Sequence, residues 1–145
     1  MQTKTFEHTV RFREIEVEPG VRKSIPIVTV GLVQPNGNRI ELPLFFDIGA
    51  NITILRWDVY PLLGLSSWDI GTPVEVSTAN GIALAYQYEF TLELFGKQAA
   101  CPVRLMMGLP SNAPFMGLLG REGIFKEFGF GFWEGSKELY VTLQP

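Results

Sequence analysis

Short apolar runs separated by turn residues cover most of the chain, and this pattern predicts a mainly β protein. Several runs alternate apolar with polar or small side chains, which is typical of strands that bury one face more than the other. In the first run, this alternation predicts five buried side chains: Phe6, Val10, Phe12, Ile15 and Val17. The expected strands are residues 5–17, 25–33, 39–46, 50–55, 74–94 (as a hairpin), 103–107, 115–120, 130–133 and 139–143.

Two Asn-Gly pairs, Asn36-Gly37 and Asn80-Gly81, separate strand-like runs. They predict hairpins, because both central positions of a tight hairpin turn favour residues that tolerate a positive φ. Two segments favour a short helix: residues 56–63, which Pro61 limits, and residues 122–128, whose apolar side chains group on one face. The second is the stronger helix prediction. Few helices among many short strands favour a small β barrel or sandwich.

Composition narrows the function classes. The chain has 145 residues, 46% of them hydrophobic, with no internal repeat or linker, so residues 1–145 are expected to form one domain. A net charge of −3 without a long run of Lys or Arg argues against nucleic-acid and anionic-membrane partners. No apolar stretch approaches the roughly 20 residues of a membrane helix, and the first residues lack a signal-peptide core. A cytoplasmic protein is therefore expected.

The chain has one cysteine and one histidine, and these counts argue against several kinds of site. Cys101 has no partner for an intramolecular disulfide and is expected to be a small core residue. His8 is the only histidine, which argues against a histidine-based metal site and against a Ser-His-Asp triad. No metal or other cofactor is expected.

Asp47 is the most unusual of the three aspartates, which are Asp47, Asp58 and Asp69. It directly follows one apolar run and shortly precedes another, and a carboxylate buried between strands costs several kcal/mol unless it is paired or hydrogen-bonded. Gly49, two residues later, lets the backbone turn sharply. Taken alone, this pattern also fits a turn aspartate that caps its own loop.

A second segment, Leu118-Leu119-Gly120-Arg121, changes this interpretation. Together with Phe46-Asp47-Ile48-Gly49-Ala50, it makes the chain resemble the single-domain retroviral-type (retropepsin-like) aspartic proteases of bacteria. The order of segments also matches: an apolar strand after the Asp-x-Gly motif, a Leu-Gly-Leu segment at residues 63–65, and a closing hairpin after residue 128. The resemblance covers roughly residues 25–143.

The resemblance implies a small closed β fold with one short C-terminal helix, active as a twofold dimer. It implies that Asp47 is catalytic and that Ile48, Gly49 and Ala50 complete its loop. The flap over the substrate would be Thr78, Ala79, Asn80, Gly81 and Ile82. Leu118, Leu119 and Gly120 would support the loop, and Arg121 would anchor the loop and the dimer by charged hydrogen bonds. Strand 139–143 would be the first choice for the dimer interface, and the N-terminal strand the second.

The chemistry implied is peptide hydrolysis at a homodimer axis. One chain carries one Asp-x-Gly, so a second copy must supply the other aspartate. Two carboxylates about 3 Å apart do not ionise together easily; they share a proton and activate a water between them.

Ile48 departs from the family pattern, which has Thr or Ser at this position. Ile lacks the hydroxyl that bonds across the dimer, although an apolar Ile48–Ile48 contact could replace it. Three outcomes stay open: a working endopeptidase, an enzyme of reduced activity, and an inactive domain that binds peptides by strand addition or serves dimerisation. A self-processing domain of a longer precursor is a further alternative.

Overall fold

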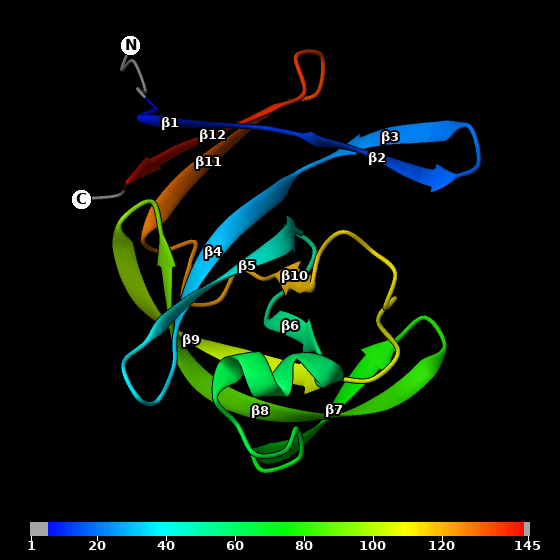
Figure 1. The fold of residues 1–145 in the computed structure, drawn as a ribbon. Coiled ribbons are helices and arrows are strands. Elements are labelled where there is room, and N and C mark those ends of the chain that lie inside the picture. The colour runs from blue at the N-terminus through cyan, green and yellow to red at the C-terminus, as the bar shows by residue number, and fades with distance from the viewer. Residues whose placement is uncertain (1–5, 144–145) are drawn as a thin grey trace.

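The computed structural model describes residues 6–143 and confirms a mainly β protein (Figure 1). Its one helical segment within this range is the 3₁₀ helix η1 (Trp57–Leu63). The strands are β1 (His8–Arg11), β2 (Arg13–Glu18), β3 (Val21–Ile25), β4 (Ile27–Val33), β5 (Arg39–Phe46), β6 (Thr53–Arg56), β7 (Thr72–Thr78), β8 (Gly81–Leu94), β9 (Lys97–Met106), β10 (Gly117–Leu119), β11 (Phe128–Trp133) and β12 (Glu138–Leu143).

Seven strands form the main sheet in the order β4-β5-β10-β6-β9-β8-β7, and β4 also pairs with β8. This additional pairing closes the sheet into a ring, with β7 outside it, and confirms the predicted small closed β structure. Closure removes the open edges that a flat sheet would expose. Apolar side chains from the ring strands and from η1 fill the interior, among them Val30, Leu44, Leu55, Leu63, Leu92 and Leu105.

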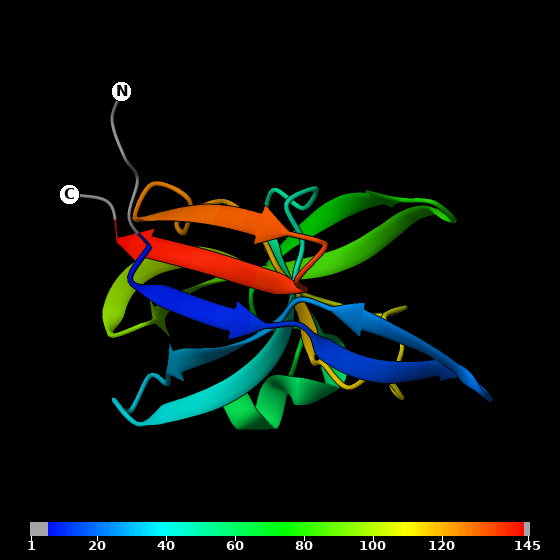
Figure 2. The same ribbon diagram turned by 90° about the horizontal axis from the view of Figure 1, so that it is seen from above.

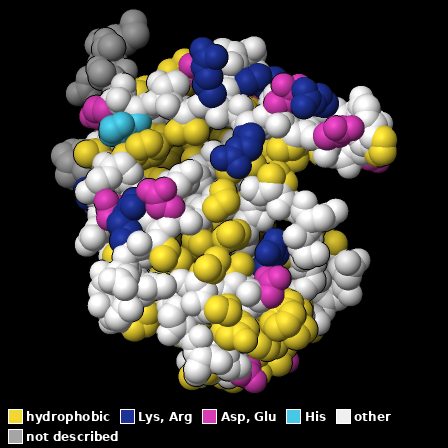
Figure 3. All heavy atoms as spheres, in the orientation of Figure 1, with side chains coloured by type: hydrophobic (Ala, Val, Ile, Leu, Met, Phe, Trp, Pro, Cys, Tyr) yellow, Lys and Arg dark blue, Asp and Glu magenta, His cyan; other side chains and the backbone are white. Residues whose placement is uncertain are grey.

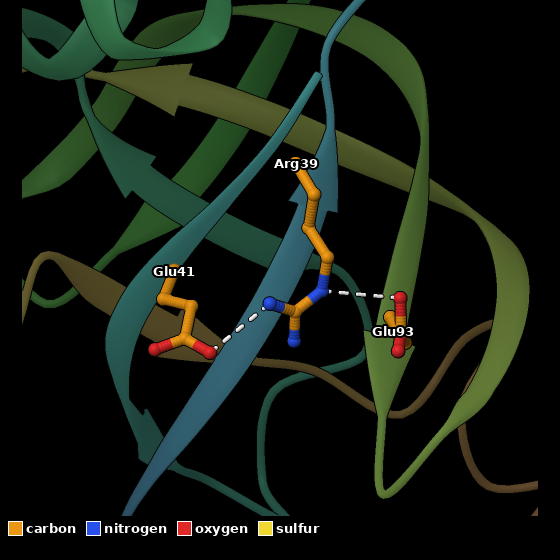
Figure 4. Close-up of polar contacts among 3 residues, drawn as sticks. All are labelled: Arg39, Glu41 and Glu93. Atoms are coloured by element: carbon orange, nitrogen blue, oxygen red, sulfur yellow. Dashed lines mark hydrogen bonds and ion pairs between the residues drawn. The ribbon is translucent and has the colours of Figure 1, made fainter. Parts of the chain in front are cut away.

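Arg39 spans the place where the ring closes (Figure 4). Gly31 of β4 pairs with Glu41 of β5 on one side and with Glu93 of β8 on the other. The Arg39 guanidinium lies over Gly31 and bonds both carboxylates, at 3.0 Å to Glu41 and 3.1 Å to Glu93. A Cβ at Gly31 would come within 2.6 Å of the Arg39 Nε atom, so the missing side chain makes room for this bridge.

Both Asn-Gly hairpins are confirmed. β4 and β5 pair along their whole length, and Gly37 in their turn has φ +88°. β7 and β8 pair from Thr72 to Gly81, where φ is +110°. The strand predicted at residues 39–46 matches β5 in both of its bounds.

A second, three-stranded sheet has the order β1-β12-β11, and β2 and β3 form a separate two-stranded ribbon (Figures 1 and 2). The run predicted as one strand at residues 5–17 is therefore wrong, because β1 and β2 belong to different sheets; Thr5 lies outside the described residues. Val17 is 44% exposed rather than buried, because the ribbon has no third strand to cover it. Pro26, which lacks an N–H, separates β3 from β4 within the predicted run 25–33.

The predicted C-terminal helix at residues 122–128 is also wrong. Residues 122–127 form consecutive turns that lead directly into β11. Gly123 has φ +84°, outside the helical region, and the only four-residue backbone bond runs from the N–H of Phe125 to the carbonyl of Arg121 at 2.9 Å. The helix limited by Pro61, at residues 56–63, is confirmed as η1.

Candidate active site

Asp47 lies at the end of β5, in a tight loop that leads to β6 (Figure 1). Its Oδ1 atom accepts a hydrogen bond of 2.9 Å from the N–H of Gly49, and its carbonyl accepts one of 3.1 Å from the N–H of Ala50. The aspartate therefore does cap its own loop. This uses one carboxylate oxygen, and the other makes no hydrogen bond with the described residues, so the half-buried side chain keeps an acceptor for a further partner.

The two sequence motifs meet in space. Strand β10 inserts between β5 and β6, with Leu118 paired to Phe45 in parallel and to Ile54 in antiparallel fashion. The N–H of Asp47 donates to the carbonyl of Leu119 at 3.3 Å, and the N–H of Arg121 donates to the carbonyl of Ala50 at 3.0 Å. Residues 118–121 thus brace the Asp47 loop through the main chain.

The close crossing explains two glycines of this segment. A Cβ at Gly120 would lie 2.6 Å from the backbone nitrogen of Thr53, and a Cβ at Gly117 would collide with the carbonyl oxygen of Ile54. Real side chains do not tolerate such distances to a backbone. Glycine at positions 117 and 120 therefore permits β10 to pass beside β6 at this depth.

Thr53 is a supporting residue that the sequence analysis missed. It is 1% exposed and is the only buried polar residue in the described part of the chain. Its Oγ1 atom accepts a hydrogen bond of 3.0 Å from the N–H of Gly120, which joins β6 to the segment after β10. The available signal was a hydroxyl inside an otherwise apolar run, since a buried hydroxyl requires a partner.

Arg121 is exposed, and its guanidinium carbon lies 5.8 Å from the centroid of the Phe125 ring. Among residues 6–143, no carboxylate lies within ion-pair distance of it. Within one chain, its contribution to the loop therefore comes from its backbone N–H and not from the charged hydrogen bonds expected of its side chain.

Ile48, the residue that departs from the family pattern, is 56% exposed at the tip of the loop. It borders a cavity of about 590 Å³ whose other walls come from Arg121, Phe125 and strand β11. An aliphatic side chain exposed to this degree beside an apolar hollow marks a surface that can pack against another apolar surface.

The five predicted flap residues lie at the turn of the β7–β8 hairpin, and all are exposed. The Thr78 hydroxyl donates to the carbonyl of Gly81 at 2.7 Å and accepts from the N–H of Asn80 at 3.2 Å, which holds the turn. Under this hairpin lies a groove of about 520 Å³. It is lined by the flap and by mainly apolar residues of the barrel, including Ile54, Met106, Met107, Leu109 and Leu118.

The groove and the loop share their supports, because Leu118 and Ile54 lie on β10 and β6, the two strands next to the Asp47 loop. Figure 3 shows the surface hollowed between the β2–β3 ribbon and the loop that follows β9. The structure thus brings a carboxylate loop, an apolar groove and a projecting hairpin to one region.

The other two aspartates are engaged elsewhere. Asp58 lies in η1 and forms an ion pair of 3.1 Å with Arg56. Asp69 accepts a hydrogen bond from the hydroxyl of Ser67. Within residues 6–143, no three His, Cys, Asp or Glu side chains gather into a metal-binding group. No helix in the same range has the length and apolarity to cross a membrane.

Comparison with known proteins identifies the fold through solved structures, whereas the sequence comparisons find no match. No protein-family model matches the sequence, and no curated protein matches it. Among solved structures, a retropepsin-like aspartic protease from Rickettsia conorii superposes with a TM-score of 0.61 at 17% identity, over 93% of this chain and 98% of that one. EIAV protease, solved with the inhibitor HBY-793, has a TM-score of 0.49 at 18% identity, over 68% and 84%. The first of these likenesses confirms the predicted retropepsin-like fold.

Proposed function

We propose that the chain is one subunit of a homodimeric aspartic endopeptidase, with Asp47 of each subunit forming the catalytic pair. The observation that carries this proposal is the crossing of β10 under the Asp47 loop, which braces the loop through main-chain hydrogen bonds. The Asp47 carboxylate is held by the N–H of Gly49 through one oxygen, and its other oxygen makes no hydrogen bond with the described residues. A turn aspartate with only a local role would not need a second segment, 70 residues away in sequence, to brace its loop.

The proposal requires a second copy of the chain. Neither of the other two aspartates is available to pair with Asp47, since Asp58 bonds to Arg56 and Asp69 to Ser67. A twofold axis beside the loop would bring Asp47 of one subunit to Asp47 of its partner, because an isologous interface joins the same patch of both copies.

Hydrolysis would then proceed by general acid–base catalysis. The pair holds one proton and positions a water; one carboxylate removes a proton from that water as its oxygen attacks the peptide carbonyl carbon. The other carboxylate donates its proton to the carbonyl oxygen, which yields a neutral tetrahedral intermediate. When the C–N bond breaks, the carboxyl that took the proton from water donates it to the leaving nitrogen. The other carboxylate accepts a proton from a hydroxyl of the intermediate as the product carboxyl group forms, so the pair holds one proton throughout.

The groove under the β7–β8 hairpin fits the substrate side of this proposal. Its walls are mainly apolar, and it runs past Ile54 and Leu118, next to the catalytic loop. An extended peptide laid in this groove would place apolar side chains against Met106 and Leu109 while the hairpin covers it. Peptide or protein substrates are therefore the expected class.

Ile48 supports a second candidate, a peptide-binding or dimerisation domain without turnover. Its side chain offers neither donor nor acceptor, so it cannot make a polar bond that would stiffen the paired loops. In that case the groove would bind an extended peptide, and binding would not depend on the Asp47 carboxylate.

A cleavage assay on a denatured protein mixture separates the two candidates. The proteins compared are the natural chain, Asp47→Asn and Ile48→Thr, each first shown to be folded. The endopeptidase predicts cleavage by the natural chain, best at mildly acidic pH, the same or higher activity in Ile48→Thr, and none in Asp47→Asn. Asn keeps the oxygen that accepts from Gly49, so loss of cleavage would not reflect a collapsed loop. If Ile48→Thr is inert as a confirmed dimer, the endopeptidase proposal fails.

A further inference from the structure

Strand β12, expected from sequence to form the dimer interface, has no open edge. It pairs with β1 from His8 to Arg11 on one side and with all six residues of β11 on the other. β1 covers Glu138–Val141 on its side, and beyond it the N–H of Leu143 donates to the Glu7 carboxylate at 3.0 Å. A second copy cannot extend this sheet through β12, and only the outer edges, β1 and β11, remain.

Strand β11 is an unprotected edge. Its sequence, Phe128-Gly129-Phe130-Gly131-Phe132-Trp133, contains no charged residue and no proline. Natural proteins normally protect open strand edges with charges, prolines or bulges, because a bare apolar edge pairs with other chains. β7, the outer strand of the main sheet, has Pro73 and Glu75, and β1 has Arg11. An edge without such protection is expected to be covered in the working protein.

The exposed end of β11 lies beside the Asp47 loop. The Phe132 ring lies 5.3 Å from the ring of Phe46, the residue directly before Asp47. Phe132 and Trp133 are 36% and 52% exposed. The apolar cavity of about 590 Å³ is bounded by Ile48 of the loop on one side and by Phe130 and Phe132 of β11 on the other. In Figure 2, β11 is the outer strand of its sheet opposite β1, and its arrowhead ends near the loop after β5.

We propose that β11 is the strand by which two copies of this chain join, edge to edge and antiparallel about the twofold axis, so that two three-stranded sheets become one of six strands. The partner copy covers the cavity between Ile48 and β11. This inference rests on the proposed function in one respect: a second copy of the chain is taken as the partner that covers the cavity, because the proposed catalytic pair needs a second Asp47. It adds which strand forms the interface and assigns β1 and β12 to contacts within one chain.

An isologous contact needs a surface that complements itself, and the patch has this property. It contains a projecting apolar side chain, Ile48, and an apolar hollow next to it. The rim carries Arg121, which has no ion pair among the described residues of its own chain.

Sedimentation equilibrium of designed variants tests the proposal. Phe132→Glu places a charge at the interface and should raise the dimer dissociation constant about tenfold or more, whereas Phe132→Leu keeps the site apolar and should stay near the natural value. Ile70→Glu is the matched control, because Ile70 is 57% exposed in a loop before β7, outside this patch. A dimer indifferent to Phe132→Glu, or a chain that stays single at every concentration reached, overturns the proposal.

Amide hydrogen exchange of the natural chain gives a test that needs no substitution, and it decides the matter should Phe132→Glu fail to fold. On raising the protein concentration through the dissociation constant, amides in residues 128–133 should exchange more slowly. Amides in β1 and in the β2–β3 ribbon should not change. Protection that appears in β1 and not in β11 contradicts the proposal.

These outcomes are distinct from those of the proposed function. A dimer that forms through β11 but cleaves no peptide, or cleaves it equally well as Asp47→Asn, removes the catalytic proposal and leaves the interface in place. If the dimer cleaves peptides in a way that depends on Asp47, but the amides of β11 exchange at the same rate at low and high protein concentration, only the interface proposal is removed.

Discussion

The Oγ1 atom of Thr53 accepts a hydrogen bond of 3.0 Å from the backbone N–H of Gly120, at a site closed to solvent. This bond joins the strand that follows the Asp47 loop to the segment that crosses beside it. Thr53→Val keeps the shape of the side chain but leaves the Gly120 N–H buried without an acceptor. The expected loss is about 1–3 kcal/mol in the free energy of unfolding, measured by urea denaturation.

Thr53→Ser is the control for this bond, because it keeps the hydroxyl and removes only a methyl group. It should lose clearly less stability than Thr53→Val. Equal losses in the two variants would show that the methyl packing, and not the hydrogen bond, is the contribution of Thr53.

The close approach at Gly120 predicts a large effect from a single methyl group. In Gly120→Ala, the new Cβ meets the backbone of Ile52 and Thr53, which cannot move aside as a flexible side chain would. Overpacking of this kind costs about 1–3 kcal/mol, and a backbone clash places the variant at the upper end. Gly135→Ala is the matched control, since its Cβ would meet nothing within 4 Å. Similar thermal stability of the two variants would contradict the crossing geometry.

The burial of Cys101 predicts that its thiol reacts slowly with thiol reagents in the native protein. The residue is fully buried, and this burial raises the pKa of its thiol to about 11. Because the thiolate is the reactive form, the native protein should react far more slowly with a thiol reagent at about pH 8 than Ser136→Cys, whose added thiol lies in an exposed turn. Denaturant should remove the difference. If the unsubstituted native protein, whose only thiol is Cys101, reacted as fast as Ser136→Cys, the prediction would be contradicted, and β9 would have to open readily.

Glu7 predicts a small acid-dependent contribution to stability. Hydrogen bonds from the Thr142 side chain and from the N–H of Leu143 lower the pKa of Glu7 below its ordinary value of 4.5. The folded state therefore binds this proton less readily than the unfolded state, so the contribution is present above pH 4.5 and is lost as the pH falls through the lower folded value. Glu7→Gln should destabilise the protein more at about pH 7 than at about pH 3, by urea denaturation. An equal effect at both pH values would contradict this.

Local sequence predicted those elements whose signal is local. β5 has apolar alternation and an Asn-Gly turn before it, and the predicted bounds agree with the structure. The β7–β8 hairpin and η1 were predicted for the same reason, from Asn80-Gly81 and from Pro61. The closed ring and the retropepsin-like fold followed from two short motifs considered together.

Other features depend on distant parts of the chain. The apolar spacing at residues 122–128 suits a helix, but Gly123 adopts a positive φ against the backbone of Ala100 and the residues form turns. The central place of β12 results from pairing with β1, more than 120 residues away in sequence, which no local pattern announces. Thr53 was missed because its partner is a backbone N–H on another element.

Subunit mixing tests the central claim, that two Asp47 carboxylates from two chains make one site. The cleaving chain and Asp47→Asn are unfolded together and refolded at constant total concentration, so that pairs form at random. If both carboxylates are required, an equal mixture retains about one quarter of the activity of the unmixed protein, because only one pair in four is intact. If each chain works with its own Asp47 alone, the equal mixture retains one half, and the shared site is contradicted.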